Sequence, residues 1–288
     1  MAQLLQIKNR IKSVDSTLKI TKAMKMIATA RLAKARNRYN KVKPVFDRLE
    51  NITRRLSNME INQKNLLYQK REVKKILFVV FSTNRGFCGG YNTKLFNFLE
   101  EQKNFLKDKE VFVLPIGEKA IEYYDKHKNI IRLSITDEII WENDLFNQSR
   151  LIMHDLKNLF LNGDFDEIDL VYNSFKTILF QQPKIKKFLP VEALENNSNE
   201  DIDYIYEPNR EVVLDRLLES YLVLSINTAL IELETGEYGA RMSAMDGANR
   251  NGEKLTKKLK IQFQRARQEA ITRQIIEIIG GSEILRRE

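Results

Sequence analysis

The sequence predicts an α/β protein in which a long helix at each end of the chain flanks a central domain of alternating strands and helices. Three observations lead to this fold class. Apolar residues near the N-terminus repeat at intervals of three and four, the segment after residue 209 shows the same spacing, and the middle alternates strand-length apolar runs with helical patterns. The predicted boundaries are 1–58 for the first helix, 72–195 for the central domain and 209–288 for the last helix.

The first helix is predicted from a heptad pattern formed by Leu4, Ile7, Ile11, Val14 and Leu18. No glycine occurs before residue 86, and the one proline in the segment, Pro44, is expected to kink or locally break the helix. A helix over residues 3–57 would be on the order of 80 Å long, which is too long to pack within an ordinary small domain.

The last helix is predicted from about residue 212 to the glycines at 280 and 281. Its 3-4 spacing is formed by Met245, Ala248, Gly252, Leu255, Leu259, Gln262 and Ala266. The small residues at 248, 252 and 266 would let a second helix approach closely, whereas Gly236 and Gly239 are expected to flank an irregularity. We expect the two long helices to pair as an antiparallel coiled coil. The alternative is that each packs independently on the central domain.

The middle of the chain is predicted to form a mostly parallel sheet with helices on its faces, because strands and helices alternate. The expected strands are 76–81, 111–116, 169–174 and 177–188, the last two partly antiparallel. The expected helices are 93–107, 118–127 and 144–161.

The composition excludes several classes of protein. The longest apolar run, Ile76–Phe81, is far shorter than the ~20 residues of a membrane-spanning helix. A single cysteine, Cys88, excludes an internal disulfide and a cysteine-built zinc site. The net charge of +9 is concentrated in residues 1–57, which carry 15 Lys and Arg against three Asp and Glu. Such a basic stripe fits a nucleic-acid surface, an acidic protein partner, or simply a solvated helix face.

The sequence contains no recognised catalytic motif. The loop Ser82–Asn92 contains glycines and lies between a predicted strand and a predicted helix, where phosphates often bind. The spacing of its glycines matches neither the dinucleotide-binding motif nor the P-loop motif, so a tight turn is favoured. The segment 247–254 has glutamate where a P-loop needs lysine. Cys88 is interpreted as a packed side chain, and His127 and His154 as packing or surface residues. The sequence therefore predicts a protein that works mechanically or by docking, not a catalyst.

Four blocks of sequence resemble the gamma subunit of F-type ATP synthases of the bacterial type. They are Ile7–Val14 continuing into Thr17–Ala28, the loop Ser82–Asn92 with one extra residue before its arginine, Tyr204–Pro208, and a final set at 240–245, 266–272 and 276–281. The blocks occur in the family's order and span nearly the whole chain. The glycine- and asparagine-containing stretch 247–252 departs from the family pattern, and the cysteine-pair insertion of the chloroplast form is absent.

The resemblance implies a rotor: a coiled-coil shaft inside an alpha3-beta3 hexamer and a Rossmann-like foot on the c ring, beside epsilon, with delta in the same assembly. It implies no cofactor, metal or catalytic residue in this chain, no nucleic-acid partner, and a peripheral location on the cytoplasmic side of a bacterial inner membrane through Fo. By resemblance, beta-subunit contacts are expected at Met24, Arg267, Gln268 and Thr272, and c-ring contacts at Tyr204, Tyr206 and Glu207. The alternative function is a basic coiled-coil protein that binds nucleic acid.

Overall fold

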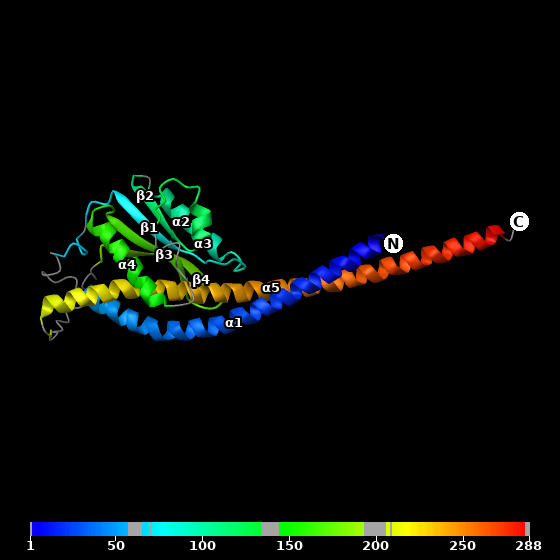
Figure 1. The fold of residues 1–288 in the computed structure, drawn as a ribbon, viewed down its shortest axis with the longest axis horizontal. Coiled ribbons are helices and arrows are strands. Elements are labelled where there is room, and N and C mark those ends of the chain that lie inside the picture. The colour runs from blue at the N-terminus through cyan, green and yellow to red at the C-terminus, as the bar shows by residue number, and fades with distance from the viewer. Residues whose placement is uncertain are drawn as a thin grey trace. The chain divides into compact units, whose positions relative to one another are not determined.

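A computed structural model of the chain describes residues 2–56, 65–69, 71–106, 108–133, 144–192, 206–207 and 209–285. In chain order the elements are α1 (Ala2–Leu56), β1 (Lys75–Phe81), α2 (Tyr91–Asn104), β2 (Glu110–Ile116), α3 (Glu118–Tyr124), α4 (Leu145–Leu161), β3 (Glu167–Phe175), β4 (Gln181–Leu189) and α5 (Arg210–Leu285) (Figure 1). Contacts divide the chain into two units, so that residues 1–28 and 242–288 form one and residues 29–241 form the other. Each long helix contributes to both.

The sheet of the second unit has the strand order β2-β1-β3-β4. β1 pairs in parallel with both β2 and β3, and β4 completes the sheet as an antiparallel edge strand on β3. The prediction of a mostly parallel sheet with a later antiparallel strand is confirmed. The last strand begins at Gln181, however, and not at Thr177, because residues 177–180 form the turn in which the Phe180 N–H donates to the Thr177 carbonyl.

Helices cover both faces of this sheet, which explains why β1 is apolar without interruption. On one face α2 and α3 contribute Leu95, Leu99 and Tyr124 to a core with the even-numbered residues of β1. On the other face α4 and α5 contribute side chains such as Leu156 and Leu222, packed against the odd-numbered residues of β1. The alternation of side chains along a strand therefore divides one apolar run between two cores.

The long helices are more continuous than the sequence predicts. α1 continues through Pro44, so the predicted local break is absent, although the proline N still cannot donate a helical hydrogen bond. α5 likewise runs from Arg210 to Leu285 without interruption at Gly236 or Gly239, so the predicted irregularity is wrong. In both helices, packing along the length outweighs the local preference of single residues.

Candidate functional site: the paired terminal helices

In the first unit, α1 and α5 lie side by side in antiparallel directions. The Thr21 hydroxyl donates to Asn249 Oδ1 at 2.6 Å, and the Thr256 hydroxyl donates to Asp15 Oδ1 at 3.3 Å, so residue numbers rise on one helix as they fall on the other. The heptad residues of α1 are partly buried along this contact, in agreement with the predicted coiled-coil seam.

Gly252 allows the two helices to approach closely, as the small-residue pattern predicts. A Cβ placed at this position would lie 2.6 Å from Cδ2 of Leu18. Gly247, one helical turn and a half earlier, has open space where its Cβ would be, since no atom lies within 4 Å. The two glycines therefore differ in their packing, in agreement with the 3-4 spacing, which includes Gly252 and leaves Gly247 out.

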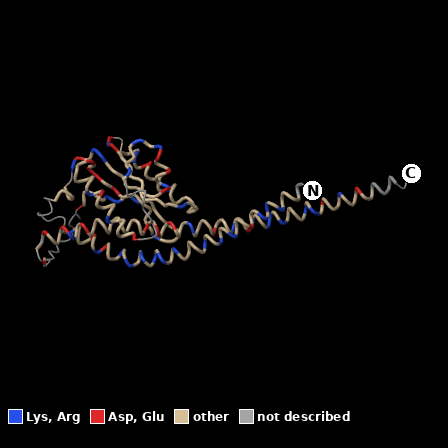
Figure 2. Tube along the Cα trace, in the orientation of Figure 1, with Lys and Arg blue, Asp and Glu red and all other residues tan. Residues whose placement is uncertain are grey.

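Lys and Arg recur along α1, as Figure 2 shows, and two lysines of this basic stripe pair with acidic residues of α5. Lys25 contacts Asp246 at 2.5 Å and Lys22 contacts Glu253 at 2.9 Å. The hydrogen bond from Lys25 holds the pKa of Asp246 below its usual value, and Lys22 does the same to the pKa of Glu253. These pairs face solvent and contribute little to stability, but they align charges of opposite sign along the helix pair.

The C-terminal part of α5 extends past the segment that α1 covers within this unit (Figure 1). Phe263, Ala266 and Ala270 are partly buried, whereas every residue from 271 to 279 is exposed. The exposed residues include Ile271, Ile275, Ile276, Ile278 and Ile279. A run of exposed isoleucines on one helix is typical of a surface that a partner covers.

The residues expected to contact partners lie in two places. Met24 is partly buried on α1, and Arg267, Gln268 and Thr272 are exposed on α5, all within the first unit. Tyr206, which is partly buried, and the exposed Glu207 immediately precede α5 in the second unit, and Tyr204 lies outside the described residues. The structure brings none of these groups into a catalytic arrangement, and their contacts with partners stay a prediction.

The glycine-containing loop at 82–92 is attached to α5 through Arg241, a role that the sequence did not indicate. The guanidinium donates to the carbonyl oxygens of Arg85 and Gly86 and pairs with Glu237 at 2.5 Å. Both charged side chains are nearly enclosed. Burial raises the pKa of Glu237, and Arg241 opposes that rise. The signal in the sequence was an arginine and a glutamate four residues apart on α5, a spacing that places both side chains on one helix face.

A second attachment fixes the same loop and sheet to α5. The Tyr91 hydroxyl donates to the carbonyl of Leu233, while the Asn173 side chain donates to the Tyr91 carbonyl. Glu232 of α5 accepts from the backbone N–H of Phe175 on β3. The loop is therefore a mechanical connection between the sheet and the long helix.

The single cysteine and the two histidines lie in ordinary packing or surface surroundings. Cys88 is buried, and burial raises the pKa of its thiol although Arg241 partly opposes the rise. His127 stacks on Tyr123, and His154 lies within hydrogen-bond distance of Asn158. Among the described residues, no three His, Cys, Asp or Glu side chains gather in a way that could hold a metal ion. None of the helices described there is both long and apolar enough to cross a membrane.

Comparison with known proteins identifies the family. A family model described as ATP synthase matches residues 3–285. The ATP synthase gamma chain of Christiangramia forsetii is 35% identical, with 99% of each chain covered, and that of Moorella thermoacetica is 36% identical, covering 99% of this chain and all of the relative. A chain from the rotor of the Euglena gracilis mitochondrial ATP synthase superposes with a TM-score of 0.65 at 16% identity, covering 94% of this chain and 99% of that chain. A chain from a second structure of the same Euglena gracilis complex gives a TM-score of 0.67 at 17% identity, covering 99% of this chain and 95% of that chain. The helices and sheet described above thus have the gamma fold, and this chain belongs to the ATP synthase gamma chain family.

Proposed function

We propose that this chain is the central-stalk rotor subunit of a proton-translocating F1Fo ATP synthase, coupling c-ring rotation to ATP synthesis or hydrolysis in the alpha3-beta3 hexamer. The match to curated gamma chains over nearly the full length carries the proposal. The uninterrupted α1 and α5 and the exposed end of α5 support it, because a shaft needs stiffness and a surface for partners to grip. Epsilon and delta complete the proposed set of F1 partners.

Rotation places a mechanical demand on this chain. Each elementary charge that crosses the membrane releases about 2.3 kcal/mol per 100 mV, and the shaft has to carry the sum of several such steps. Directional contacts such as the Arg241 attachment resist sliding between the sheet and α5, whereas apolar packing alone is non-directional. The chain would therefore transmit torque through the second unit into the helices that leave it.

The assembly test is native mass spectrometry of the complex purified from the cells that produce the chain. The expected result is a mass equal to three alpha subunits, three beta subunits and one copy of this chain, with smaller subunits attached. A chain that purifies with nucleic acid and without the hexamer would contradict the proposal, and it would favour the basic nucleic-acid-binding alternative.

The chain itself is proposed to be non-catalytic, with the nucleotide sites in the hexamer. The buried Cys88 supports this, because burial raises the pKa of its thiol whereas a catalytic thiol has to be accessible and ionised. Calorimetry of the purified chain is expected to detect no stoichiometric, micromolar ATP binding, and activity assays no hydrolysis. Either signal would contradict the proposal. We also propose a peripheral location on the cytoplasmic side of the membrane through Fo.

The exposed face formed by Arg267, Gln268 and Thr272, with Met24 on α1, is proposed to contact the beta subunits. Arginine offers a planar fork for carboxylates, and Gln and Thr add directional hydrogen bonds. Replacing Arg267 and Gln268 by alanine keeps helix propensity, so assembly is expected to continue while ATP-driven proton pumping or ATP hydrolysis falls. Lys260→Ala, an exposed site on the same helix, is the control. Wild-type rates in a normally assembled double mutant would contradict the assignment.

Tyr204, Tyr206 and Glu207 are proposed to approach the polar loops of the c ring. Aromatic side chains with polar tips suit a half-exposed interface, and Tyr206 is partly buried in the chain by itself. Cysteines introduced at positions 204, 206 and 207 are expected to crosslink to c-ring loops in assembled membranes. Crosslinks to beta subunits alone would place this segment at the opposite end of the stalk and refute the assignment.

A further inference from the structure

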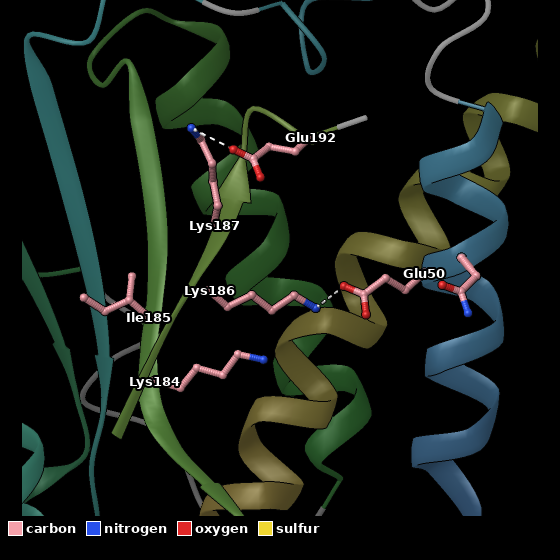
Figure 3. Close-up of a pocket in the computed structure, with 7 residues that line it drawn as sticks. Glu50, Lys184, Ile185, Lys186, Lys187 and Glu192 are labelled. Carbon is pink, nitrogen blue, oxygen red and sulfur yellow. Dashed lines mark ion pairs between the residues drawn. The ribbon is translucent and has the colours of Figure 1, made fainter. Parts of the chain in front are cut away.

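Lys186 is a charged residue on the edge strand β4 whose side chain is only 9% exposed. Figure 3 shows Lys184 and Lys186 pointing from β4 toward the long helices, whereas Ile185 points away from them. The two lysines share a strand and a direction but not an environment, because Lys184 is exposed. Lys186 reaches one wall of an open pocket of about 290 Å³ and ends at Glu50 of α1.

The Lys186 ammonium group contacts both long helices at once. Its Nζ lies 2.8 Å from Glu50 Oε1 and 4.1 Å from the ring centroid of Phe46, both on α1. The ring of Tyr221, on α5, has its centroid 5.6 Å from the same atom. Phe46 and Tyr221 stack with centroids 6.0 Å apart and an interplanar angle of 11°. One ammonium therefore interacts with an anion and two aromatic faces drawn from the two helices.

This arrangement is not explained by stability alone. Removing an ammonium and a carboxylate from water costs much of what their attraction returns, and apolar residues of similar volume often stabilise a protein as well or better. A buried ion pair does supply direction, because it is satisfied in one geometry only. Such pairs are best attested as devices that set the register of packed elements.

α1 is paired with α5 through Arg38 and Glu234 at 3.0 Å and through Lys43 and Glu232 at 3.7 Å. Its register on the sheet therefore depends on these pairs, acting through α5, and on its direct contacts with the strands. α5 is held to the sheet by the hydrogen bond from the Phe175 N–H to Glu232 and by that from Tyr91 to Leu233. α1 contacts β3 through Tyr39, whose ring meets Phe175 edge-on and whose hydroxyl lies 3.5 Å from the Phe175 carbonyl, a weak contact. The Lys186–Glu50 pair is a second, charged link from the sheet to α1, about three helical turns further along.

We propose that Lys186 is a positioning residue that holds α1 in register on the sheet, so that torque received by the α/β layer enters α1 instead of being lost as sliding. This rests on the proposed rotor function. Glu50 supplies the direction, and the Phe46 and Tyr221 rings form the cage that prevents the ammonium from turning toward solvent.

The register is tested in the full chain with pairs of spin labels, in a background with Cys88 replaced by alanine. Labels at the exposed positions Arg48 and Gln182 report the distance between α1 and β4. Lys186→Met keeps the aliphatic stem and removes the charge. We expect it to shift or broaden this distance by about 1.5 Å or more, one residue of helix rise. Lys186→Arg is expected to restore the wild-type distribution.

Two controls separate register from general damage. Lys184→Met removes the same charge from the same strand and is expected to leave the distribution unchanged. Labels at Gln182 and Ser220 report the distance from β4 to α5, which is expected to stay constant in Lys186→Met. If that variant does not fold, Glu50→Gln is measured in its place with the same expectation. A wild-type distribution between positions 48 and 182 in the variant measured overturns the proposal.

Coupling is then measured in membrane vesicles as ATP-driven proton pumping relative to ATP hydrolysis. The ratio is expected to fall in Lys186→Met, to recover in Lys186→Arg and to equal the wild type in Lys184→Met. An unchanged ratio in Lys186→Met overturns the role in torque transfer. Failure of the proposed function is a separate result: the wild-type chain would not purify with the hexamer, and the spin-label distances would still report whether Lys186 sets the register.

Discussion

Gly236 provides a direct test of how closely the sheet approaches α5. A Cβ at this position would lie 2.7 Å from the hydroxyl oxygen of Tyr91 and 3.1 Å from its Cε2. Tyr91 is buried, and its hydroxyl is already committed to the carbonyl of Leu233 at 3.2 Å. Gly236→Ala therefore forces a rigid, enclosed ring to move and disturbs a buried hydrogen bond.

The magnitude follows from three contributions. Alanine in place of glycine favours a helix interior by about 1 kcal/mol. Loss of the Tyr91 hydrogen bond costs about 1 kcal/mol, which offsets that gain. Overpacking an enclosed site costs about 1–3 kcal/mol, and this is the net destabilisation that we expect. The matched control is Gly247→Ala, where no atom lies within 4 Å of the new Cβ and the expected effect is a gain of about 1 kcal/mol.

Native-state hydrogen exchange read by mass spectrometry is the suitable assay, because a chain with two units does not unfold as one two-state system. Peptides covering residues 230–240 are expected to exchange about 5- to 150-fold faster in Gly236→Ala. Adding Tyr91→Phe removes the atom that the Cβ would meet first, so the double variant should recover part of the loss. Slower exchange in Gly236→Ala, as in Gly247→Ala, would refute the packing argument.

Two further predictions concern buried charges. Burial raises the pKa of Asp169 to about 7 in the folded chain, from an ordinary value near 3.8. Between these two pH values the unfolded chain has lost the Asp169 proton while the folded chain keeps it, so stability falls as the pH rises from about 4 to about 7. Asp169→Asn is expected to remove this loss of stability. The difference in thermal midpoint between the variant and the wild type should therefore be larger at pH 8 than at pH 5. An equal difference at both pH values would contradict the raised pKa of Asp169. Arg241→Met leaves the enclosed Glu237 without its partner. It is expected to lower the local opening free energy of the α5 segment around these residues by about 3–5 kcal/mol, measured by native-state hydrogen exchange. Adding Glu237→Gln should recover much of that cost, and strict additivity of the two substitutions would show that the pair is not coupled.

The sequence by itself determined the elements and the family. The heptad spacing of Leu4 to Leu18 and the unbroken run Ile76–Phe81 are local signals, since the periods of a helix and of a doubly buried strand appear directly in the order of apolar residues. The antiparallel pairing was also predicted, because two long helices with 3-4 spacing lie at opposite ends of the chain, and Gly252 marked where a second helix could approach. The four motif blocks were sufficient to indicate the family over nearly the whole length.

The tertiary structure alone decided what individual polar and small residues do. Gly236 is an irregularity when judged by propensity, and the structure shows that it is a contact site for Tyr91, 145 positions away in the chain. Arg241 and Lys186 carry no pattern that names Gly86 or Glu50 as their partners. Helix and strand periods are properties of neighbouring residues, whereas these contacts depend on which faces meet after the sheet and the long helices have packed, and that information is distributed over the whole chain.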